Sequence, residues 1–223
     1  MLEALHKDLV KKVYDKASGY YDWLHHVGTF NLDQKGRKYL VNRIVKNGDL
    51  ILDAGGGTGT TSILALKESG GQAKSVVLDF SENMLEKAKE KARKNNFEDR
   101  ITLKVGDMYD IPFPDNYFDV VISTYSTCPL DDPLKAVKEM LRVLKPNGLM
   151  GIAHSSQAEN GMARKLGNWM ERVIWKFPRL SMGCRNIDLL TGINKMNVEI
   201  IENKLIGFIP WFFRILVLRK VEN

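Results

Sequence analysis

The chain has 223 residues, of which 44% are hydrophobic, and it carries a formal net charge of +6 with a pI near 9.2. This length suits one α/β domain with additions better than two full domains. No apolar run reaches the roughly 18 residues of a membrane span, and the charged, helix-patterned start does not have the form of a secretory signal. The two cysteines, Cys128 and Cys184, are too few for a disulfide scaffold, so a reduced, cytoplasmic protein is expected. The basic balance favours anionic partners only mildly, because a solvated basic surface explains it equally well.

The pattern of apolar residues changes near residue 48. Residues 1–47 have the apolar spacing of helices and are predicted to form an N-terminal helical lid. Short apolar strands then alternate with helices through a core that spans 48–155. The strands are predicted over 50–55, 75–80, 101–107, 118–124 and 149–155, with helices over 60–69, after the capping Ser81, and from 132 to 144. This alternation predicts a doubly wound α/β fold with a mostly parallel sheet and helices on both faces.

The last part of the chain has a different pattern. Residues 156–197 contain a helical stripe, and they are predicted to form a cap, inserted after the fifth strand, that packs on the sheet and covers an acceptor. Two strands at 198–208 and 213–221, joined by a short link around Pro210, are predicted to pair as an antiparallel edge hairpin within 198–223. These two strands bring the predicted sheet to seven, and lid, core, cap and edge strands are expected to form a single domain over 1–223.

The first predicted strand contains Asp53 near its end, and four glycines lie within the five residues 55–59. In doubly wound sheets a ligand binds beyond the carboxyl ends of the strands, where glycines let it touch the backbone and a helix N-terminus favours an anion. The chain has neither a GxGxxG pattern nor the lysine of a P-loop. Asp79, twenty residues after the last glycine, lies where an acid binds ribose hydroxyls. The alternative is a tight turn with a surface aspartate, and the further Gly106–Asp107 pair argues against it.

Five segments, LDAGGGTG, LDFSENML, GDM, FDVVIS and LKPNG, resemble the class I S-adenosylmethionine-dependent methyltransferases in order and spacing, over roughly residues 45–155. The resemblance implies S-adenosylmethionine as cofactor, S-adenosylhomocysteine as product, and no metal. It implies that the glycines lie under the methionine part, that Asp53 lies by its amino group and that Asp79 binds the ribose hydroxyls. The other implied cofactor contacts are Ala54, Gly55, Gly57 and Gly59 in the loop, Phe80 or Met84 packed on the adenine, Asp107 and Met108 at the adenine edge, and Gly106 and Ser123.

The N-terminal segments VYDKASGYYD (13–22) and TFNLDQKGRKYLV (29–41) resemble the ubiquinone and menaquinone C-methyltransferase family, within the methyltransferase type 11 group. Asn31 departs from that family's pattern, which has a glycine there. The resemblance implies that Tyr21 closes over the carboxylate end of the cofactor; the alternative is a tyrosine that packs a helix on the core. Residues 155–196 match that family poorly and look more like enzymes that methylate phospholipid amines, small thiols and other small acceptors. The expected acceptor is therefore small and apolar or amphiphilic, and carbon, nitrogen, sulfur and oxygen all stay open as the methylated atom.

Methyl transfer is an in-line displacement at a sulfonium methyl, so the protein must supply alignment and, for a weak nucleophile, a base. His154 ends the fifth strand and is a candidate base; the alternative is a hydrogen-bonded rim histidine. Tyr125 and Cys128, in the loop after the fourth strand, are candidate acceptor contacts with Trp169 of the cap, and Cys128 is expected to be a wall residue rather than a nucleophile. This loop lacks the Asn/Asp-Pro-Pro-aromatic motif of enzymes that methylate nucleic-acid amines, so no nucleic-acid partner is expected.

The apolar stripe of the cap is predicted to face the sheet, and it consists of Met162, Leu166, Trp169, Met170, Val173, Ile174 and Phe177. Trp175 lies roughly opposite this stripe and is expected to be exposed. Six basic residues against two acids over 156–185 make a basic segment, and a basic helix with an exposed tryptophan can rest on an anionic lipid surface. Peripheral membrane contact is therefore an alternative to a purely cytoplasmic location. A non-catalytic S-adenosylmethionine-binding or regulatory protein is the alternative to an enzyme, and the intact Asp53 and Asp79 argue against it.

Overall fold

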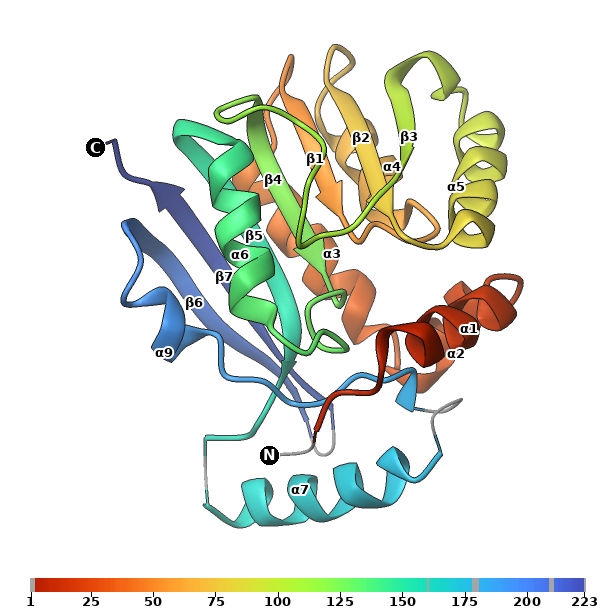
Figure 1. Ribbon diagram of the computed structural model, residues 1–223, viewed down its shortest axis with the longest axis vertical. Coiled ribbons are helices and arrows are strands. Elements are labelled where there is room, and N and C mark those ends of the chain that lie inside the picture. The colour runs from red at the N-terminus through yellow and green to blue at the C-terminus, as the bar shows by residue number, and fades with distance from the viewer. Residues whose placement is uncertain (1–2, 160, 178–180, 209–210, 223) are drawn as a thin grey trace.

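The computed structural model describes residues 3–159, 161–177, 181–208 and 211–222, so the predicted link around Pro210 lies outside the described residues. The chain forms a seven-stranded sheet in the order β3-β2-β1-β4-β5-β7-β6 (Figure 1). Neighbours from β3 to β5 run parallel, whereas β7 is antiparallel to both β5 and β6. The strands are β1 (Leu50–Ala54), β2 (Lys74–Asp79), β3 (Ile101–Val105), β4 (Phe118–Thr124), β5 (Leu144–Ser156), β6 (Val198–Phe208) and β7 (Trp211–Lys220).

Helices cover both faces of this sheet. They are α1 (Lys7–Ala17), α2 (Tyr21–Gly28), α3 (Leu32–Ile44), α4 (Thr60–Glu68), α5 (Glu82–Lys94), the short 3₁₀ helix η1 (Glu98–Arg100), α6 (Pro133–Val143), α7 (Gly161–Trp175) and α9 (Leu190–Ile193). One core forms where α6 and α9 pack on the sheet, and a second forms where α3 and α4 pack on the opposite face. Successive side chains of a strand point to opposite faces of the sheet and so pack in different cores. Ile152 of β5 belongs to the first core and Ala153 to the second. The predicted fold class, with its antiparallel edge pair, is confirmed.

The predicted start of the fifth strand is wrong by five residues. The helix that begins at Pro133 ends at Val143, and β5 begins at Leu144 rather than at residue 149. Leu144 pairs with Phe118 of β4, and its carbonyl oxygen accepts a hydrogen bond of 2.7 Å from Lys220 Nζ. These contacts fix the backbone at the start of β5, before Asn147, which has a positive φ of +61°. The register between β4 and β5 shifts at the same place.

The helix predicted over 160–177 is present as α7, but the prediction of its buried face is wrong. Met162, Leu166, Trp169 and Val173 are 85, 47, 62 and 42% exposed, whereas Trp175 is half-buried. The inward face is instead small and partly polar. It consists of Ala163, Gly167, Glu171 and Ile174, of which the last three line a small hollow that β7 also lines. Within the described residues, no helix combines the length and the apolar character needed to cross a bilayer.

Candidate active site

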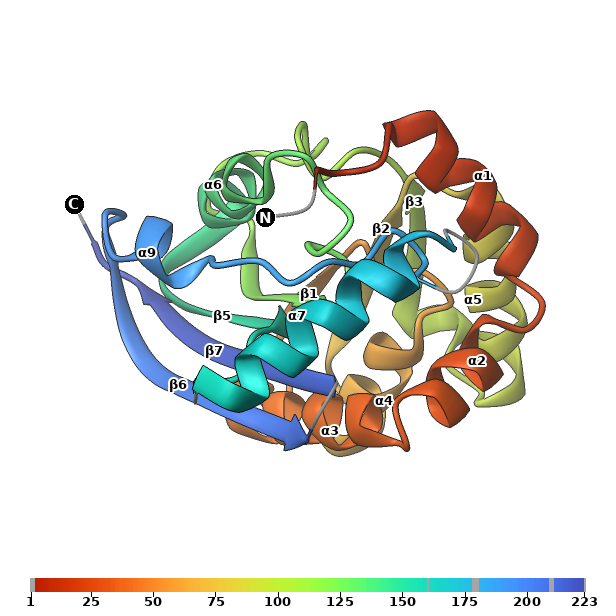
Figure 2. The same cartoon turned by 90° about the horizontal axis from the view of Figure 1, so that it is seen from below.

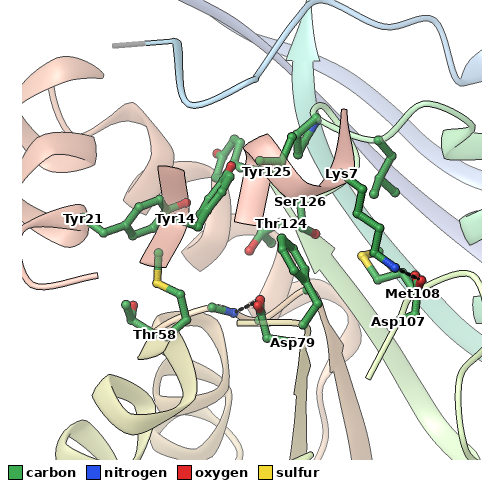
Figure 3. A pocket seen from close by; sticks show the side chains of 18 of the residues that line it. Lys7, Tyr14, Tyr21, Thr58, Asp79, Asp107, Met108, Thr124, Tyr125 and Ser126 are labelled. Carbon is green, nitrogen blue, oxygen red and sulfur yellow. Dashed lines mark hydrogen bonds and ion pairs between the residues drawn. The ribbon is translucent and has the colours of Figure 1, made fainter. Parts of the chain in front are cut away.

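A cavity of about 320 Å³ lies beyond the carboxyl ends of β1, β2, β3 and β4 (Figure 3). Its floor comes from the glycine loop after β1, and its walls come from the ends of the neighbouring strands. Its roof comes from α1 and α2, the N-terminal helices that were predicted as a lid. The predicted site residues that line it are Tyr21, Gly55, Gly57, Asp79, Phe80, Met84, Asp107, Met108 and Tyr125.

The glycine loop has a backbone that residues with side chains would not adopt easily. Gly55, Gly57 and Gly59 have φ angles of +66°, +55° and +71°, in the left-handed region. A Cβ atom on Gly55 would lie 2.5 Å from Ser126 Cβ, so the loop can lie against the end of β4 only because it has no side chain there. Gly59 does not line the cavity; it is the N-cap of α4. The N-terminus of α4 thus follows directly on the cavity floor, which suits an anionic group.

Asp79 is the carboxylate at the centre of the cavity wall. Its side chain accepts hydrogen bonds of 2.9 Å from the backbone N–H groups of Gly57 and Ser81, and lone pairs remain for a ligand. Burial raises the pKa of Asp79 to about 6, against these hydrogen bonds, which lower it. The group is therefore mostly ionised at neutral pH and becomes neutral under mildly acidic conditions. Phe80 and Met84 line the cavity beside it.

Asp53 does not line the cavity, and the structure places it beneath the loop. Its side chain is buried, and Oδ2 accepts hydrogen bonds from the backbone N–H and the hydroxyl of Ser62, at 3.1 and 2.8 Å. Oδ1 has no hydrogen-bond partner among the described residues. Asp53 thus anchors the first turn of α4 to the end of β1, and Gly56 passes over its carboxylate. Ala54, Gly106 and Ser123 also lie outside the cavity lining.

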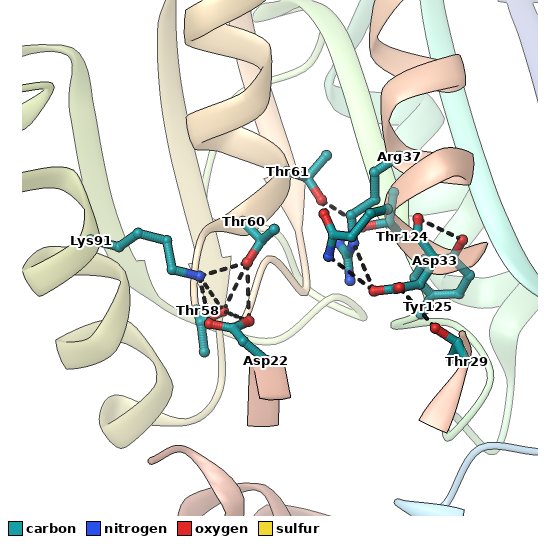
Figure 4. A network of polar contacts seen from close by, with 11 residues as sticks. Asp22, Thr29, Asp33, Arg37, Thr58, Thr60, Thr61, Lys91, Thr124 and Tyr125 are labelled. Atoms are coloured by element: carbon teal, nitrogen blue, oxygen red, sulfur yellow. Dashed lines mark hydrogen bonds and ion pairs between the residues drawn. The ribbon is translucent and has the colours of Figure 1, made fainter. Parts of the chain in front are cut away.

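Polar contacts fasten the lid to the residues below the cavity. Lys7 of α1 forms an ion pair with Asp107, a residue that was predicted to contact the edge of the adenine (Figure 3). Asp22 of α2 accepts hydrogen bonds from Thr58, Thr60 and Lys91, at 2.8, 3.1 and 2.7 Å (Figure 4). Burial alone would raise the pKa of Asp22, but the Lys91 charge and these hydrogen bonds hold it below its usual value. Between these contacts, the rings of Tyr14 and Tyr21 face the cavity and lie 5.8 Å apart.

Arg37 of α3 is a cavity residue that was not predicted. Its side chain is buried, and its Nη1 donates hydrogen bonds to the hydroxyls of Thr61 and Thr124 (Figure 4). Its Nε has no hydrogen-bond partner among the described residues, although Asp33 lies 3.8 Å away as an ion pair. The guanidinium also lies 5.0 Å from the ring centre of Tyr125. Only the position of Arg37 in the basic stretch of residues 29–41 was a signal in the sequence.

Tyr125 is the one predicted acceptor contact that lines the cavity, and its φ of +62° is unusual for a residue with a side chain. Non-glycine residues in this region are often held at functional sites. Burial raises the pKa of Tyr125, against the effect of Arg37, so the phenol stays protonated. Trp169 points away into solvent, and Cys128 is buried behind the wall, where its sulfur accepts a hydrogen bond of 3.1 Å from the N–H of Ser155.

His154 does not line the cavity, so its predicted place at the ligand-binding edge is wrong. Side chains alternate along β5, and His154 shares the face of Ile152, which packs against the core under α6 and α9. It is fully buried, its Nδ1 lies 2.9 Å from the carbonyl oxygen of Ser155, and its Nε2 has no hydrogen-bond partner among the described residues. Burial lowers the pKa of His154 to about 4, so the ring is neutral at physiological pH.

The sheet order, the glycine loop and the acid at the end of β2 define the class I methyltransferase type of Rossmann-like protein. The chain belongs to the methyltransferase domain family, whose model matches residues 45–191. Among solved structures, it is similar to the geranyl diphosphate C-methyltransferase from Streptomyces coelicolor A3(2), with a TM-score of 0.71, 15% identity, and coverage of 86% of this chain and 80% of that one. At this identity the likeness concerns the fold alone.

Among curated proteins, the chain is similar to demethylmenaquinone methyltransferases. The chain is 36% identical over 152 residues to the demethylmenaquinone methyltransferase of Listeria welshimeri, which covers 68% of this chain and 64% of the relative. It is 33% identical over 159 residues to the demethylmenaquinone methyltransferase of Lactobacillus johnsonii, covering 71% of this chain and 65% of the relative. The match thus spans somewhat less than two thirds of the relatives' own length. The predicted resemblance to class I methyltransferases, near the quinone C-methyltransferases, is confirmed.

Proposed function

We propose that this protein transfers the methyl group of S-adenosylmethionine to a small acceptor of the quinone type. The observation that carries this proposal is a single cavity in which a carboxylate, a guanidinium and a bare glycine backbone face one another under an aromatic lid. A ligand with a diol, a carboxylate and an apolar ring fits this combination. Asp79 keeps lone pairs that the protein does not use, and a buried carboxylate of this kind is stabilised by a polar ligand rather than by an apolar one.

Each part of the cofactor has a counterpart in the cavity. The unused lone pairs of Asp79 suit the two ribose hydroxyls, and the apolar side chains of Phe80 and Met84 suit the adenine. Asp107 and Met108 line the part of the wall beyond the adenine position. Gly55 and Gly57 leave room for the methionine part directly over the backbone.

Arg37 is proposed to bind the methionine carboxylate. A guanidinium matches a carboxylate in a planar, two-point geometry, and Arg37 lines the cavity while its Nε faces Asp33. Tyr21 lies within the electrostatic range of Arg37 and lines the same part of the cavity, which agrees with the predicted closure over the carboxylate end.

The bound cofactor would supply a sulfonium, whose methyl carbon is already activated for displacement. The chain's own residues then have to hold the acceptor in line and keep water out. Lid residues Leu5 and Val10 and loop residues Pro129 and Leu130 provide an apolar wall for this. His154 is not placed to take a proton from the acceptor, so the acceptor is expected to present its own reactive, electron-rich atom.

The tyrosines around the cavity favour an acceptor that carries ring oxygens. Burial raises the pKa of Tyr14, so its hydroxyl stays protonated at neutral pH and can donate a hydrogen bond, whereas the hydroxyl of Tyr125 already donates to the carbonyl oxygen of Asp33, at 3.2 Å. An aromatic ring with oxygens, such as a reduced naphthoquinone, offers an acceptor for the Tyr14 donor and an apolar body for the wall. The demethylmenaquinone methyltransferases among the relatives act, by their names, on a molecule of this kind.

The test is an incubation with S-adenosylmethionine that carries a labelled methyl group and a reduced demethylated naphthoquinone with an isoprenoid tail. The expected result is a labelled, singly methylated quinone together with an equal amount of S-adenosylhomocysteine, both detected by mass spectrometry. A protein that binds the cofactor but forms no S-adenosylhomocysteine with any quinone acceptor would support the non-catalytic alternative instead. The Asp79→Ala variant is the matched inactive control.

A further inference from the structure

Large apolar side chains are exposed mainly at one end of the molecule. The described part of the chain exposes fifteen of them, and eleven belong to α1, α2, the segments just before and just after α2, α7 with the residues that follow it, and the end of β6. Figure 2 shows that α7, α1, α2 and the end of the β6–β7 hairpin lie together at this end. We name this set the apolar end; it consists of Leu9, Tyr20, Trp23, Val27, Phe30, Met162, Leu166, Trp169, Val173, Phe177 and Phe208. Such a concentration is more than scattered surface apolar residues explain.

The outer face of α7 is amphipathic along its length. Met162, Leu166, Trp169 and Val173 recur at helical spacing and form one exposed strip. At 100° per residue, the exposed Lys165, Arg172 and Lys176 fall along one edge of this strip.

No acid offsets these charges on α7. The helix has one acidic residue, Glu171, which is turned inward and accepts a hydrogen bond of 2.6 Å from the backbone N–H of Asn186. Lys165, Arg172 and Lys176 form no ion pair with any other described residue. The outer face is therefore both apolar and cationic.

The strip continues onto the lid and the hairpin. Phe177 and Lys176 share a groove with Tyr20 and with residues of α1, which include Leu9, Lys12 and Lys16. On the other side, the ring of Phe30 packs on that of Phe208, with the ring centres 5.8 Å apart, and both rings stay largely exposed. The result is an apolar surface that has lysines and arginines at its border.

We propose that the apolar end docks on the surface of a lipid bilayer that contains anionic lipids. A helix with an exposed apolar strip beside unpaired basic residues lies in a membrane interface, where the strip is buried and the charges meet lipid phosphates. The uncompensated cationic border selects an anionic surface. The docking surface rests on exposed residues alone and does not depend on which acceptor is methylated.

The same end of the molecule includes part of the roof of the cavity. Val10 and Tyr14 of α1 line the cavity, while Leu9 and Lys12 on its other face belong to the groove beside Phe177. Contact with lipid at α1 would therefore act directly on the roof of the site. This consequence rests on the proposed function, since it matters only if the acceptor is a lipid-soluble molecule.

The test measures flotation of the full chain with vesicles, without cofactor or acceptor. The wild-type protein should bind vesicles of phosphatidylcholine mixed with phosphatidylglycerol at low salt, and not vesicles of phosphatidylcholine alone. Leu166→Ser with Trp169→Ser should weaken this binding by about tenfold or more, because both side chains leave water on docking. Both residues are exposed, so the fold should be unaffected. Ile201→Ser with Val221→Ser removes two apolar residues of similar exposure outside the apolar end and should leave binding unchanged.

Fluorescence gives a second measurement at defined positions. A variant that keeps only Trp169 should shift to the blue when mixed vesicles are added, and added salt should reverse the shift. Equal binding by the wild type and the Leu166–Trp169 double variant would overturn the proposal, as would the absence of wild-type binding at low salt. A wild-type dimer in sedimentation equilibrium that the double variant abolishes, without vesicle binding, would assign the surface to a second copy of the chain and overturn it too.

Discussion

Helices α5 and α7 have similar apolar spacing but opposite surroundings. In α5 the stripe Met84, Leu85, Ala88 and Ala92 is between 1 and 5% exposed. In α7 four residues of the predicted stripe are between 42 and 85% exposed. The stripe of α7 was predicted to face the sheet and does not, whereas the stripe of α5 is buried.

The difference follows from how each helix is connected. α5 links the parallel neighbours β2 and β3, and such a crossover has to pack back onto the sheet. α7 follows β5, after which the chain returns as the antiparallel pair β6 and β7, so no crossover forces it onto a sheet face. Helical periodicity thus predicts that a helix has an apolar face, whereas the connection determines what covers that face.

The largest expected effect is a difference in the free energy of unfolding between two matched leucine-to-alanine variants. Leu85→Ala on α5 should lower the free energy of unfolding by about 2–4 kcal/mol, because it leaves a cavity beside a buried stripe. Leu166→Ala on α7 should change it by no more than about 0.5 kcal/mol, since that side chain is 47% exposed. Urea denaturation followed by circular dichroism measures both. Similar losses for the two variants would mean that the α7 stripe is buried after all.

His154 was predicted at the ligand-binding edge of β5 and is buried instead. The pH dependence of folding stability tests this burial. Its pKa is lowered to about 4 in the folded protein, so the unfolded chain takes up a proton first as the pH falls from about 6.5. Folding stability should therefore fall by about 3 kcal/mol from this residue between those pH values. His154→Gln should remove that part of the pH dependence. Thermal denaturation across this range measures it, with His6→Gln as the control at an exposed site. An unchanged pH dependence in His154→Gln would show that the ring is accessible to protons.

The third prediction tests whether Asp79 binds the ribose of the cofactor. Asp79→Asn should weaken S-adenosylmethionine binding by about ten- to hundredfold, because roughly 1.5–3 kcal/mol of charge-assisted hydrogen bonding is lost. In the wild type, affinity should fall as the pH drops below about 6, since protonation removes the charged acceptor, and the variant should lack this dependence. Calorimetry measures both, and the exposed Asp99→Asn is the matched control. Full affinity in Asp79→Asn would contradict the assignment of the ribose position.

The smallest expected effect is the change in stability when a lysine of α5 or a lysine of α7 is replaced. Lys91 of α5 binds Asp22, Thr58 and Thr60, whereas Lys165 of α7 is exposed and forms no ion pair among the described residues. Lys91→Met should cost about 1 kcal/mol or less, because Asp22 is partly screened by solvent, and should speed hydrogen exchange in α2. Lys165→Met should do neither. Unchanged exchange in Lys91→Met would mean that other contacts hold the lid.

The sequence predicted the glycine loop and the strand-end residues of the cavity because these residues lie at or just after the ends of strands. Gly55, Asp79 and Met108 come directly after apolar runs, and parallel strands bring their carboxyl ends to one edge. His154 also ends such a run, but a strand has two faces, and the sequence did not show which one this residue takes. Arg37 was missed because it reaches the cavity from a helix, where nothing in the local pattern marks it as a cavity residue.

The sequence by itself thus determined the order of strands and helices, the glycine loop and the acid opposite it. These features depend on backbone conformation and on spacing along a few neighbouring residues, which the local sequence controls. Only the tertiary structure decided that Arg37 meets the cavity, that His154 turns away from it and that Trp169 faces solvent. Those placements depend on which surfaces meet across segments far apart in the chain, and periodicity contains no information about the partner surface.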